Sequence, residues 1–317
     1  MSTEEFFSLQ GKRIWVAGHK GMVGSAIVRQ LADDRCEILT ADRKDLDLRD
    51  GSQVDAWVRK QRPDVVFLAA ATVGGILANN DFPAKFLYDN LMIETNVIHA
   101  CYEARVAKLL FLGSSCIYPR MAPQPISEDA LLTGPLESTN EWYAVAKIAG
   151  IKLTQAYRKQ HGVNFISAMP TNLYGPGDNF DLATSHVVPA LLRKVHEAKQ
   201  REEPNVILWG TGRPLREFMH VDDCARACIH LMENYSGYEH INVGTGEEIS
   251  IAELAKTIMK IAGYNGSITF DTSKPDGTPR KLLDVTRLRE SGWSPTIHLR
   301  DGLLSTYNWY LSTLGRA

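Results

Sequence analysis

Continuous apolar runs that alternate with helical segments are the feature that most constrains the fold of this chain. The first apolar run covers residues 13–17, helical periodicity follows over residues 22–32, and the alternation continues through the first half of the sequence. Strands with one solvent-exposed face alternate between apolar and polar residues, whereas strands covered on both faces are apolar throughout. The pattern therefore predicts an α/β fold, in which helices cover both faces of a doubly wound parallel sheet.

The expected elements can be given as residue ranges. We expect strands at residues 13–17, 37–40, 64–70, 108–112, 164–169, 206–209 and 240–243. We expect helices at residues 22–32, 86–104, 141–161, 185–199 and 251–262. Beyond about residue 175 the gaps between elements lengthen and contain Gly, Pro and Arg, which indicates a change in architecture.

Composition excludes several classes of protein. The 317 residues carry 35 Lys and Arg against 37 Asp and Glu, so the chain lacks the basic surplus that is typical of nucleic-acid binders. No run approaches the roughly 18 apolar residues of a membrane-spanning helix, and the acidic residues 1–10 do not resemble a signal peptide. The five cysteines are scattered without a C-x-x-C pair, as is typical of reduced thiols. We therefore expect a soluble protein of the cytoplasm, without a metal site.

A glycine-rich turn joins the first expected strand to the first expected helix. Residues 18–24 place Gly18, Gly21 and Gly24 in a G-x-x-G-x-x-G pattern. Such glycines let the backbone turn tightly and approach a pyrophosphate, which the positive end of the following helix attracts. A glycine-rich loop without this role is the alternative, but the position between a strand and a helix favours a dinucleotide-binding Rossmann sheet.

The end of the second expected strand indicates which dinucleotide is bound. Asp42 could hold the ribose 2′-hydroxyl of NAD, whereas Arg43 could accept the 2′-phosphate of NADP. Lys20 in the glycine turn adds a second cation, so we expect NADP(H). The alternative is that Arg43 and Lys44 simply form a solvated surface.

A tyrosine and a lysine lie four residues apart in the expected helix 141–161. Tyr143 and Lys147 therefore share one face of that helix. The ammonium of Lys147 could lower the pKa of the phenol and hold the nicotinamide ribose, so that Tyr143 exchanges a proton with a sugar oxygen. Ser114 follows the expected strand 108–112 and so lies at the carboxyl edge of the sheet, where open α/β sheets bind ligands. The combination predicts a carbonyl reductase.

These observations suggest two domains. Residues 1–175 are expected to form an NADP-binding Rossmann domain, to which the chain returns over about residues 206–245. Residues 176–317 are expected to form mainly a smaller α/β domain that binds the substrate.

The glycine turn, Ser114, Tyr143 and Lys147 together resemble the extended short-chain dehydrogenase/reductase family, over essentially the whole chain. Further motifs narrow the resemblance to members that act on a GDP-linked 4-keto-6-deoxy sugar. These motifs are residues 113–119, 170–176, 178–180, 185–192, 216–218 and 274–281. The resemblance implies an NADP-dependent oxidoreductase with epimerase activity, which inverts C3 and C5 of GDP-4-keto-6-deoxy-D-mannose and reduces C4 in nucleotide-sugar biosynthesis. The long helix expected at residues 86–104 could pair two subunits in a bundle, as in the enzymes that the chain resembles, and it is this resemblance that implies a homodimer.

The resemblance also implies the roles of individual residues. Cys116 is implied as the base and His186 as the acid of the inversions, while Ser114 and Tyr143 hold the C4 oxygen. The implied cofactor contacts are Gly18, Lys20, Gly21, Met22, Val23, Gly24, Arg43, Asp47, Leu48, Leu112, Gly113, Tyr143, Lys147, Pro170, Asn172, Leu173 and His186. The implied substrate contacts are Ser115, Asn172, Lys194, Trp209, Arg216, Asp276 and Lys281.

Alternatives remain for some of these residues and for the whole chain. Without the resemblance, Cys116 would be interpreted as a small core residue and His186 as a residue that caps a helix. Trp209 suits the core and a binding site equally. The chain could also act on another nucleotide-sugar, or it could be a regulator that senses nucleotides without catalysis. Intact Ser114, Tyr143 and Lys147 count against the regulator.

Overall fold

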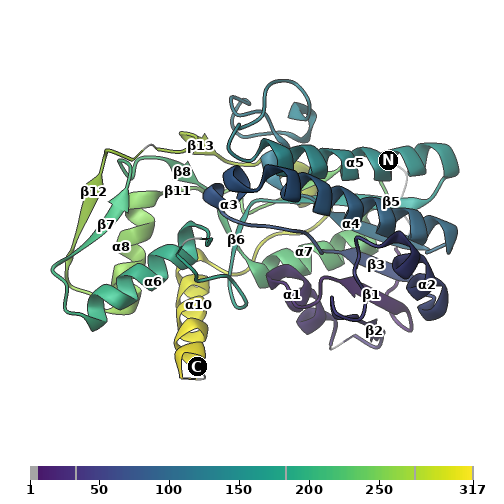
Figure 1. Cartoon of the computed structure of the whole chain (residues 1–317), viewed down its shortest axis with the longest axis horizontal. Helices are drawn as coiled ribbons and strands as arrows, with labels where there is room; N and C mark the ends of the chain where they lie inside the picture. The colour runs from purple at the N-terminus through teal and green to yellow at the C-terminus, as the bar shows by residue number, and fades with distance from the viewer. Residues whose placement is uncertain (1–5, 33, 183, 275, 316–317) are drawn as a thin grey trace.

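The computed structural model describes residues 6–32, 34–182, 184–274 and 276–315 (Figure 1). Residues 1–5 and residue 275 of the motif 274–281 lie outside the described residues. Six strands form one parallel sheet in the order β10-β5-β4-β3-β1-β2. They are β1 (Arg13–Ala17), β2 (Glu37–Leu39), β3 (Val65–Leu68), β4 (Lys108–Leu112), β5 (Asn164–Pro170) and β10 (Ile241–Val243). The predicted doubly wound α/β sheet is confirmed.

Helices cover both faces of this sheet (Figure 1). On one face lie α1 (Met22–Leu31) and α7 (Val221–Asn234), and on the other lie α2 (Gly51–Gln61), α4 (Pro83–Glu103) and α5 (Glu141–His161). Along β3, Val65 and Phe67 pack into the core on the α1 side, whereas Val66 and Leu68 pack into the core on the α4 side. Because successive residues of a strand face opposite ways, a strand between two helical layers must be apolar at every position.

The rest of the chain forms a smaller unit beside the sheet (Figure 1). In it, β7 (Asn205–Trp209) pairs in parallel with β12 (Ser267–Asp271). Around these strands and a third apolar core lie α6 (Val187–Gln200), α8 (Ile251–Ala262) and α10 (Leu299–Leu314). No helix within the described ranges is long and apolar enough to cross a membrane.

Short elements connect the two parts. They are α3 (Ile76–Asp81), α9 (Thr286–Glu290), β6 (Asn172–Tyr174), β8 (Leu215–Arg216), β9 (Phe218–His220), β11 (Ile249–Ser250) and β13 (Arg280–Lys281), with 3-10 turns at Ser115–Ile117 and Glu128–Ala130. β6 pairs with β9, and β8 lies between β11 and β13.

Several element boundaries match the sequence closely, whereas other elements were not expected. β1, β4, α5 and α8 have the expected bounds, but α2, α7 and α10 were not among the expected helices. The buried face of α7 combines four Ala and Cys residues with Val221, Leu231 and Met232, so the helical period is present in the sequence and was not recognised. The chain returns to the large sheet through α7 and β10, while β7 lies in the smaller sheet, so the return begins later than residue 206.

A buried carboxylate ties the smaller unit to the large sheet. Glu217 is 0% exposed and accepts hydrogen bonds from the backbone N–H groups of Thr245 (2.7 Å), Gly246 (2.8 Å) and Leu283 (3.0 Å). Thr245 and Gly246 follow β10, and Leu283 follows β13. One side chain therefore fixes the segment that carries Lys281 against the edge of the large sheet.

Replacing Glu217 with Ala is expected to cost more stability than removing an exposed cap. Glu217→Ala leaves one buried and two partly buried N–H groups without an acceptor and should lower the free energy of unfolding by about 3 kcal/mol or more. Ser250→Ala removes the exposed capping box of α8 and should cost about 1 kcal/mol. Urea unfolding followed by circular dichroism measures both losses, and losses of equal size would contradict the role given to Glu217.

Candidate functional site

The glycine turn lies where the strand order of the large sheet reverses. β1 has β2 on one side and β3 on the other, so the carboxyl ends of β1 and β3 border a crevice. Gly18 follows β1 with a φ of +91°, and a Cβ there would lie 2.6 Å from the backbone nitrogen of Ala70. A Cβ at Gly24 would collide with the carbonyl of Gly18. Within the described residues, no side chain caps α1, which begins after Gly21. The backbone N–H groups of its first turn therefore remain available to bind a pyrophosphate.

Charged side chains surround the end of β2, beside this turn. The Nζ of Lys20 lies 2.6 Å from Oδ2 of Asp42, and this hydrogen bond lowers the pKa of the Asp42 carboxyl. Arg43 is exposed and helps to lower the pKa of Asp47 to about 2, although the main cause is a hydrogen bond from Arg49. Lys20 thus balances the negative charge of Asp42, while the guanidinium of Arg43 faces solvent.

The other residues predicted to contact the cofactor lie in the segments that follow β1, β2, β4 and β5. They are Met22 and Val23 in α1, Leu48 before α2, Leu112 and Gly113 at the end of β4, Pro170 at the end of β5, and Asn172 and Leu173 in β6. A Cβ at Gly113 would collide with the sulfur of Met169. The side-chain amide of Asn172 donates to the Glu217 carbonyl oxygen at 2.9 Å.

Ser114, Cys116, Tyr143 and Lys147 gather at the carboxyl end of β4. The Nζ of Lys147 donates to the carbonyl oxygen of Leu112 at 3.0 Å and lies 5.9 Å from the centroid of the Tyr143 ring. The backbone N–H of Cys116 donates to Oγ of Ser114 at 3.4 Å. The 3-10 turn that holds Cys116, together with its buried neighbour Ser115, packs on α5. The structure therefore brings four of the five predicted catalytic residues into one cluster.

The pKa shifts in this cluster differ from the expectation. We expected Lys147 to lower the pKa of the Tyr143 phenol, but burial raises it, and Cys116 and Glu94 raise it further, while a hydrogen bond with Ser114 lowers it. Burial also lowers the pKa of Lys147 itself, against the pull of Glu94 and Cys116. Desolvation is the largest cause of both shifts, and Lys147 is not among the groups that lower the pKa of Tyr143. A phenol that stays protonated has the form that a general acid needs.

Cys116 and His186 are the base and the acid that the resemblance implies for the inversions. Cys116 is 8% exposed, and burial raises the pKa of its thiol, while Lys281 is the strongest of the groups that lower it. His186 precedes α6, and much of its side chain is exposed. The surrounding protein, and then the charge of Lys281, lower the pKa of its imidazole. Lys281 therefore acts electrostatically on both residues, although it lies far from them in the sequence.

The remaining residues predicted to contact substrate lie on the smaller unit. Trp209, at the end of β7, is 58% exposed, which excludes a core role. The Nζ of Lys194 in α6 lies 5.6 Å from the centroid of this ring. Asp276 accepts hydrogen bonds from the N–H (2.8 Å) and the hydroxyl (2.7 Å) of Thr211. Arg216, which pairs with Lys281 across β8 and β13, is partly buried, and its guanidinium donates to the Leu215 carbonyl oxygen at 2.8 Å.

One charged residue of the catalytic cluster was not predicted. Glu94 in α4 is 1% exposed, its carboxyl group lies against Gly150 of α5, and it interacts electrostatically with Lys147. Its place in the sequence carries a signal, because Asn90, Glu94 and Ile98 share one helix face, and all three are buried. An acidic residue on the buried face of a helix indicates a specific partner.

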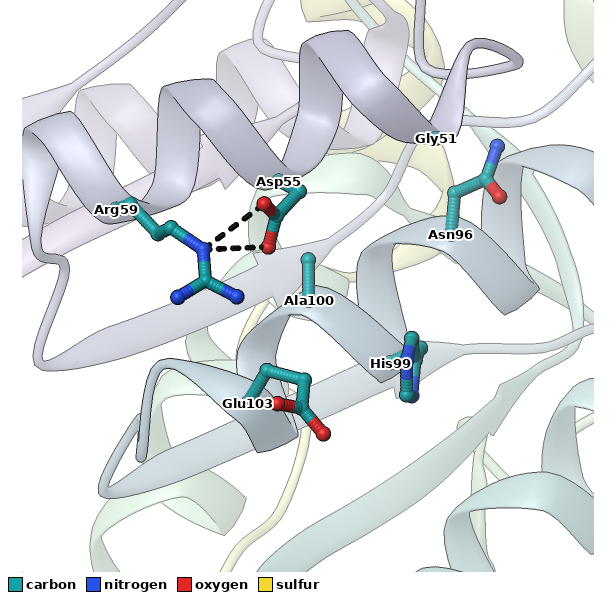
Figure 2. Close-up of a pocket in the computed structure, with 7 residues that line it drawn as sticks. All are labelled: Gly51, Asp55, Arg59, Asn96, His99, Ala100 and Glu103. Carbon is teal, nitrogen blue, oxygen red and sulfur yellow. Dashed lines mark hydrogen bonds and ion pairs between the residues drawn. The ribbon is translucent and has the colours of Figure 1, made fainter.

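A cavity of about 290 Å³ lies between α2 and α4 (Figure 2). Its lining contains none of the predicted site residues, and the Arg59 guanidinium in its wall bonds the Asp55 carboxylate at 2.8 Å. Within the described ranges, no group of three His, Cys, Asp or Glu residues gathers as a metal site. The clustered titratable groups with perturbed pKa values lie at the carboxyl edge of the sheet, which makes that edge the candidate active site.

Known proteins resemble this chain in sequence and in fold. A protein of Sinorhizobium fredii named GDP-L-fucose synthase is 59% identical over 97% of this chain and 98% of its own length. A protein of Escherichia coli with the same name is 55% identical over 96% and 98%. The solved structure of a GDP-L-fucose synthetase from Naegleria fowleri bound to NADP is 30% identical, covers 100% of this chain and 99% of its own, and has a TM-score of 0.90. Residues 14–244 match the sequence model of one family, and the chain therefore belongs to the NAD dependent epimerase/dehydratase family.

Proposed function

We propose that this protein converts GDP-4-keto-6-deoxy-D-mannose to GDP-L-fucose by inverting C3 and C5 and reducing C4 with NADPH. The proposal is carried by the full-length identity of 59% to a protein named GDP-L-fucose synthase, together with the cluster of Ser114, Cys116, Tyr143 and Lys147 at the sheet edge. The protein works in the cytoplasm, because its five free cysteines suit a reducing compartment.

The inversions begin with the loss of a proton beside the ketone. C3 and C5 flank the C4 carbonyl, so their protons are acidic, and Cys116 removes one as a thiolate. His186 returns a proton to the opposite face, which inverts the carbon. The positive charge of Lys281 favours the thiolate, and hydrogen bonds from Ser114 and Tyr143 stabilise the negative charge on the C4 oxygen.

The reduction uses the same oxygen. NADPH, when bound, supplies the hydride that adds to C4. Tyr143 gives its phenol proton to the C4 oxygen, and the raised pKa of Tyr143 keeps that proton in place beforehand. Lys147, held on the Leu112 carbonyl, stabilises the phenolate that results. One pair of donors, Ser114 and Tyr143, therefore serves both reactions.

Binding is divided between the two parts of the chain. Residues 1–175 hold NADP(H) on the glycine turn and Arg43, and residues 176–317 mainly hold the GDP-sugar. The exposed ring of Trp209 suits a nucleotide base. The cations of Lys194 and Arg216 suit the diphosphate, since guanidinium groups bind phosphate oxygens in pairs. Ser115, Asn172 and Asp276 complete the set of predicted substrate contacts.

The protein forms a homodimer through α4 and α5. Large apolar side chains are exposed on these two helices, with Tyr88 61%, Trp142 45% and Val145 38% exposed. A four-helix contact with a second copy would cover them.

Product analysis tests the proposed function directly. Incubation with GDP-4-keto-6-deoxy-D-mannose and NADPH should consume NADPH and yield GDP-L-fucose, identified by NMR. Tyr143→Phe should slow the reduction by about 10²–10⁴-fold, because it lacks the acid. A sugar reduced with C3 and C5 unchanged would indicate a simple keto-reductase, and an absence of NADPH consumption would favour a regulator.

Cys116→Ser is expected to separate the two reactions. An alcohol is a far weaker base than a thiol, so this variant should lose inversion and still reduce the ketone. In D₂O without NADPH, the wild-type protein should take up deuterium at C3 and C5, and Cys116→Ser should take up little. His186→Asn should likewise impair inversion, because it lacks the acid on the opposite face. Exchange at the wild-type rate in Cys116→Ser would leave Cys116 as a core thiol.

Arg43→Ala tests the cofactor. Because Asp42 is already paired with Lys20, Arg43 is the exposed cation that would receive the 2′-phosphate. The substitution should raise the KM for NADPH by about tenfold or more and leave the KM for NADH nearly unchanged. Lys44→Ala, one residue further along the exposed segment, serves as the matched control. Equal effects of Arg43→Ala on both cofactors would refute the assignment.

A further inference from the structure

Glu94 and Lys147 place a carboxyl group and an amine in the core between α4 and α5. Glu94 is 1% exposed and Lys147 is 2% exposed. Within the described part of the chain, neither carboxylate oxygen of Glu94 accepts a hydrogen bond of normal geometry. The groups that favour its charged form are Lys147 first and then the backbone of Gly150. A buried carboxylate without hydrogen bonds is costly, so the ionised form of Glu94 requires a compensating charge.

The surrounding residues confine the two groups to one space. Lys147 and Gly150 are three residues apart in α5 and share a face. A Cβ at Gly150 would lie 3.0 Å from Cδ of Glu94 and would also meet the ring of Phe111. The Nζ of Lys147 lies 4.6 Å from the centroid of the same ring. Gly150 thus makes room for the carboxyl group, and Phe111 forms a wall against both charged groups.

The charge of Glu94 matters because burial acts against Lys147. Burial lowers the pKa of the Lys147 ammonium, and Glu94 is the first of the groups that oppose this shift, followed by Cys116. Burial likewise raises the pKa of Glu94. Tyr143 in α5 and Cys116 in the 3-10 turn are the other titratable groups that interact with this pair in the described residues. Each member of the pair therefore stabilises the charged form of the other.

We propose that Glu94 is a positioning residue, which keeps Lys147 protonated and thereby keeps the Tyr143 phenol able to reduce the ketone at alkaline pH. The inference rests on the proposed function, because it uses the reduction as the reaction that Lys147 supports. Glu94 does not touch the reacting atoms. It acts through Lys147, which bonds the Leu112 carbonyl and faces the Tyr143 ring, and its charge also raises the pKa of the Tyr143 phenol.

A double-mutant cycle tests the pair without reference to any reaction. Glu94→Gln leaves a buried ammonium without its counter-charge, and Lys147→Met leaves a buried carboxyl group. Each single variant should lower the midpoint of urea unfolding, whereas the double variant should recover much of the loss, because neither charge remains. Losses that simply add would overturn the pairing. A single variant that fails to fold while the double variant folds would support it.

The pH profile of NADPH oxidation tests the consequence for reduction. Without the carboxylate, the pKa of Lys147 falls, so the alkaline limb of the profile for Glu94→Gln should move down by about one pH unit or more. At about pH 9 its rate should fall tenfold or more relative to wild type, while at about pH 6.5 it should stay within about threefold. Glu94→Asp keeps the charge and should hold the limb close to that of wild type.

The two experiments distinguish a failure of this inference from a failure of the proposed function. A uniform fall in rate at every pH, with the alkaline limb unmoved, would show a structural role and overturn the inference. If the wild-type protein oxidises no NADPH with this keto-sugar, the proposed function fails, and the double-mutant cycle still decides whether Glu94 and Lys147 are coupled.

Discussion

The parallel alignment of β1, β3, β4 and β5 is the constraint on which the candidate site depends. Parallel strands end at the same edge, so the segments that follow them meet there. Gly18 after β1 packs against Ala70 after β3, and Ser114 after β4 is followed by the turn that carries Cys116. A sheet covered on both faces can supply this alignment only with strands that are apolar at every position. The buried parallel sheet is therefore the common cause of the apolar pattern in the sequence and of the position of the site.

Much of this arrangement could be predicted from local sequence. The bounds of β1, β4 and α5, the glycine turn and the pair of Tyr143 and Lys147 all follow from periodicity and spacing within a few residues. The action of Lys281 on Cys116 could not be predicted from spacing, because these residues are far apart in the chain, and Glu217 holds the segment that follows Lys281 beside the end of β10. The exposure of Trp209 and the direction of the Tyr143 pKa depend on packing by distant segments.

Desolvation explains why the electrostatic expectations failed where the geometric ones did not. An ammonium beside a phenol lowers the pKa of the phenol only while the ammonium is itself charged. In this site the ammonium and the phenol oxygen are both surrounded by protein, and burial raises the pKa of Tyr143 while lowering that of Lys147. Sequence spacing gives the neighbour, but the sign of the net shift depends on how much protein surrounds both groups.

The two lysines of the site therefore differ in what sustains their charge and in what they act on. Lys281 lies on β13, and its charged form is favoured first by Cys116 and then by Glu137 and Glu217. The charge of Lys281 in turn acts on Cys116 and His186. Lys147 lies on α5, and its charge depends first on Glu94. In the proposed reaction these lysines serve inversion and reduction respectively. Different carboxylates therefore favour the charged forms of the two lysines, although Cys116 interacts with both and couples them.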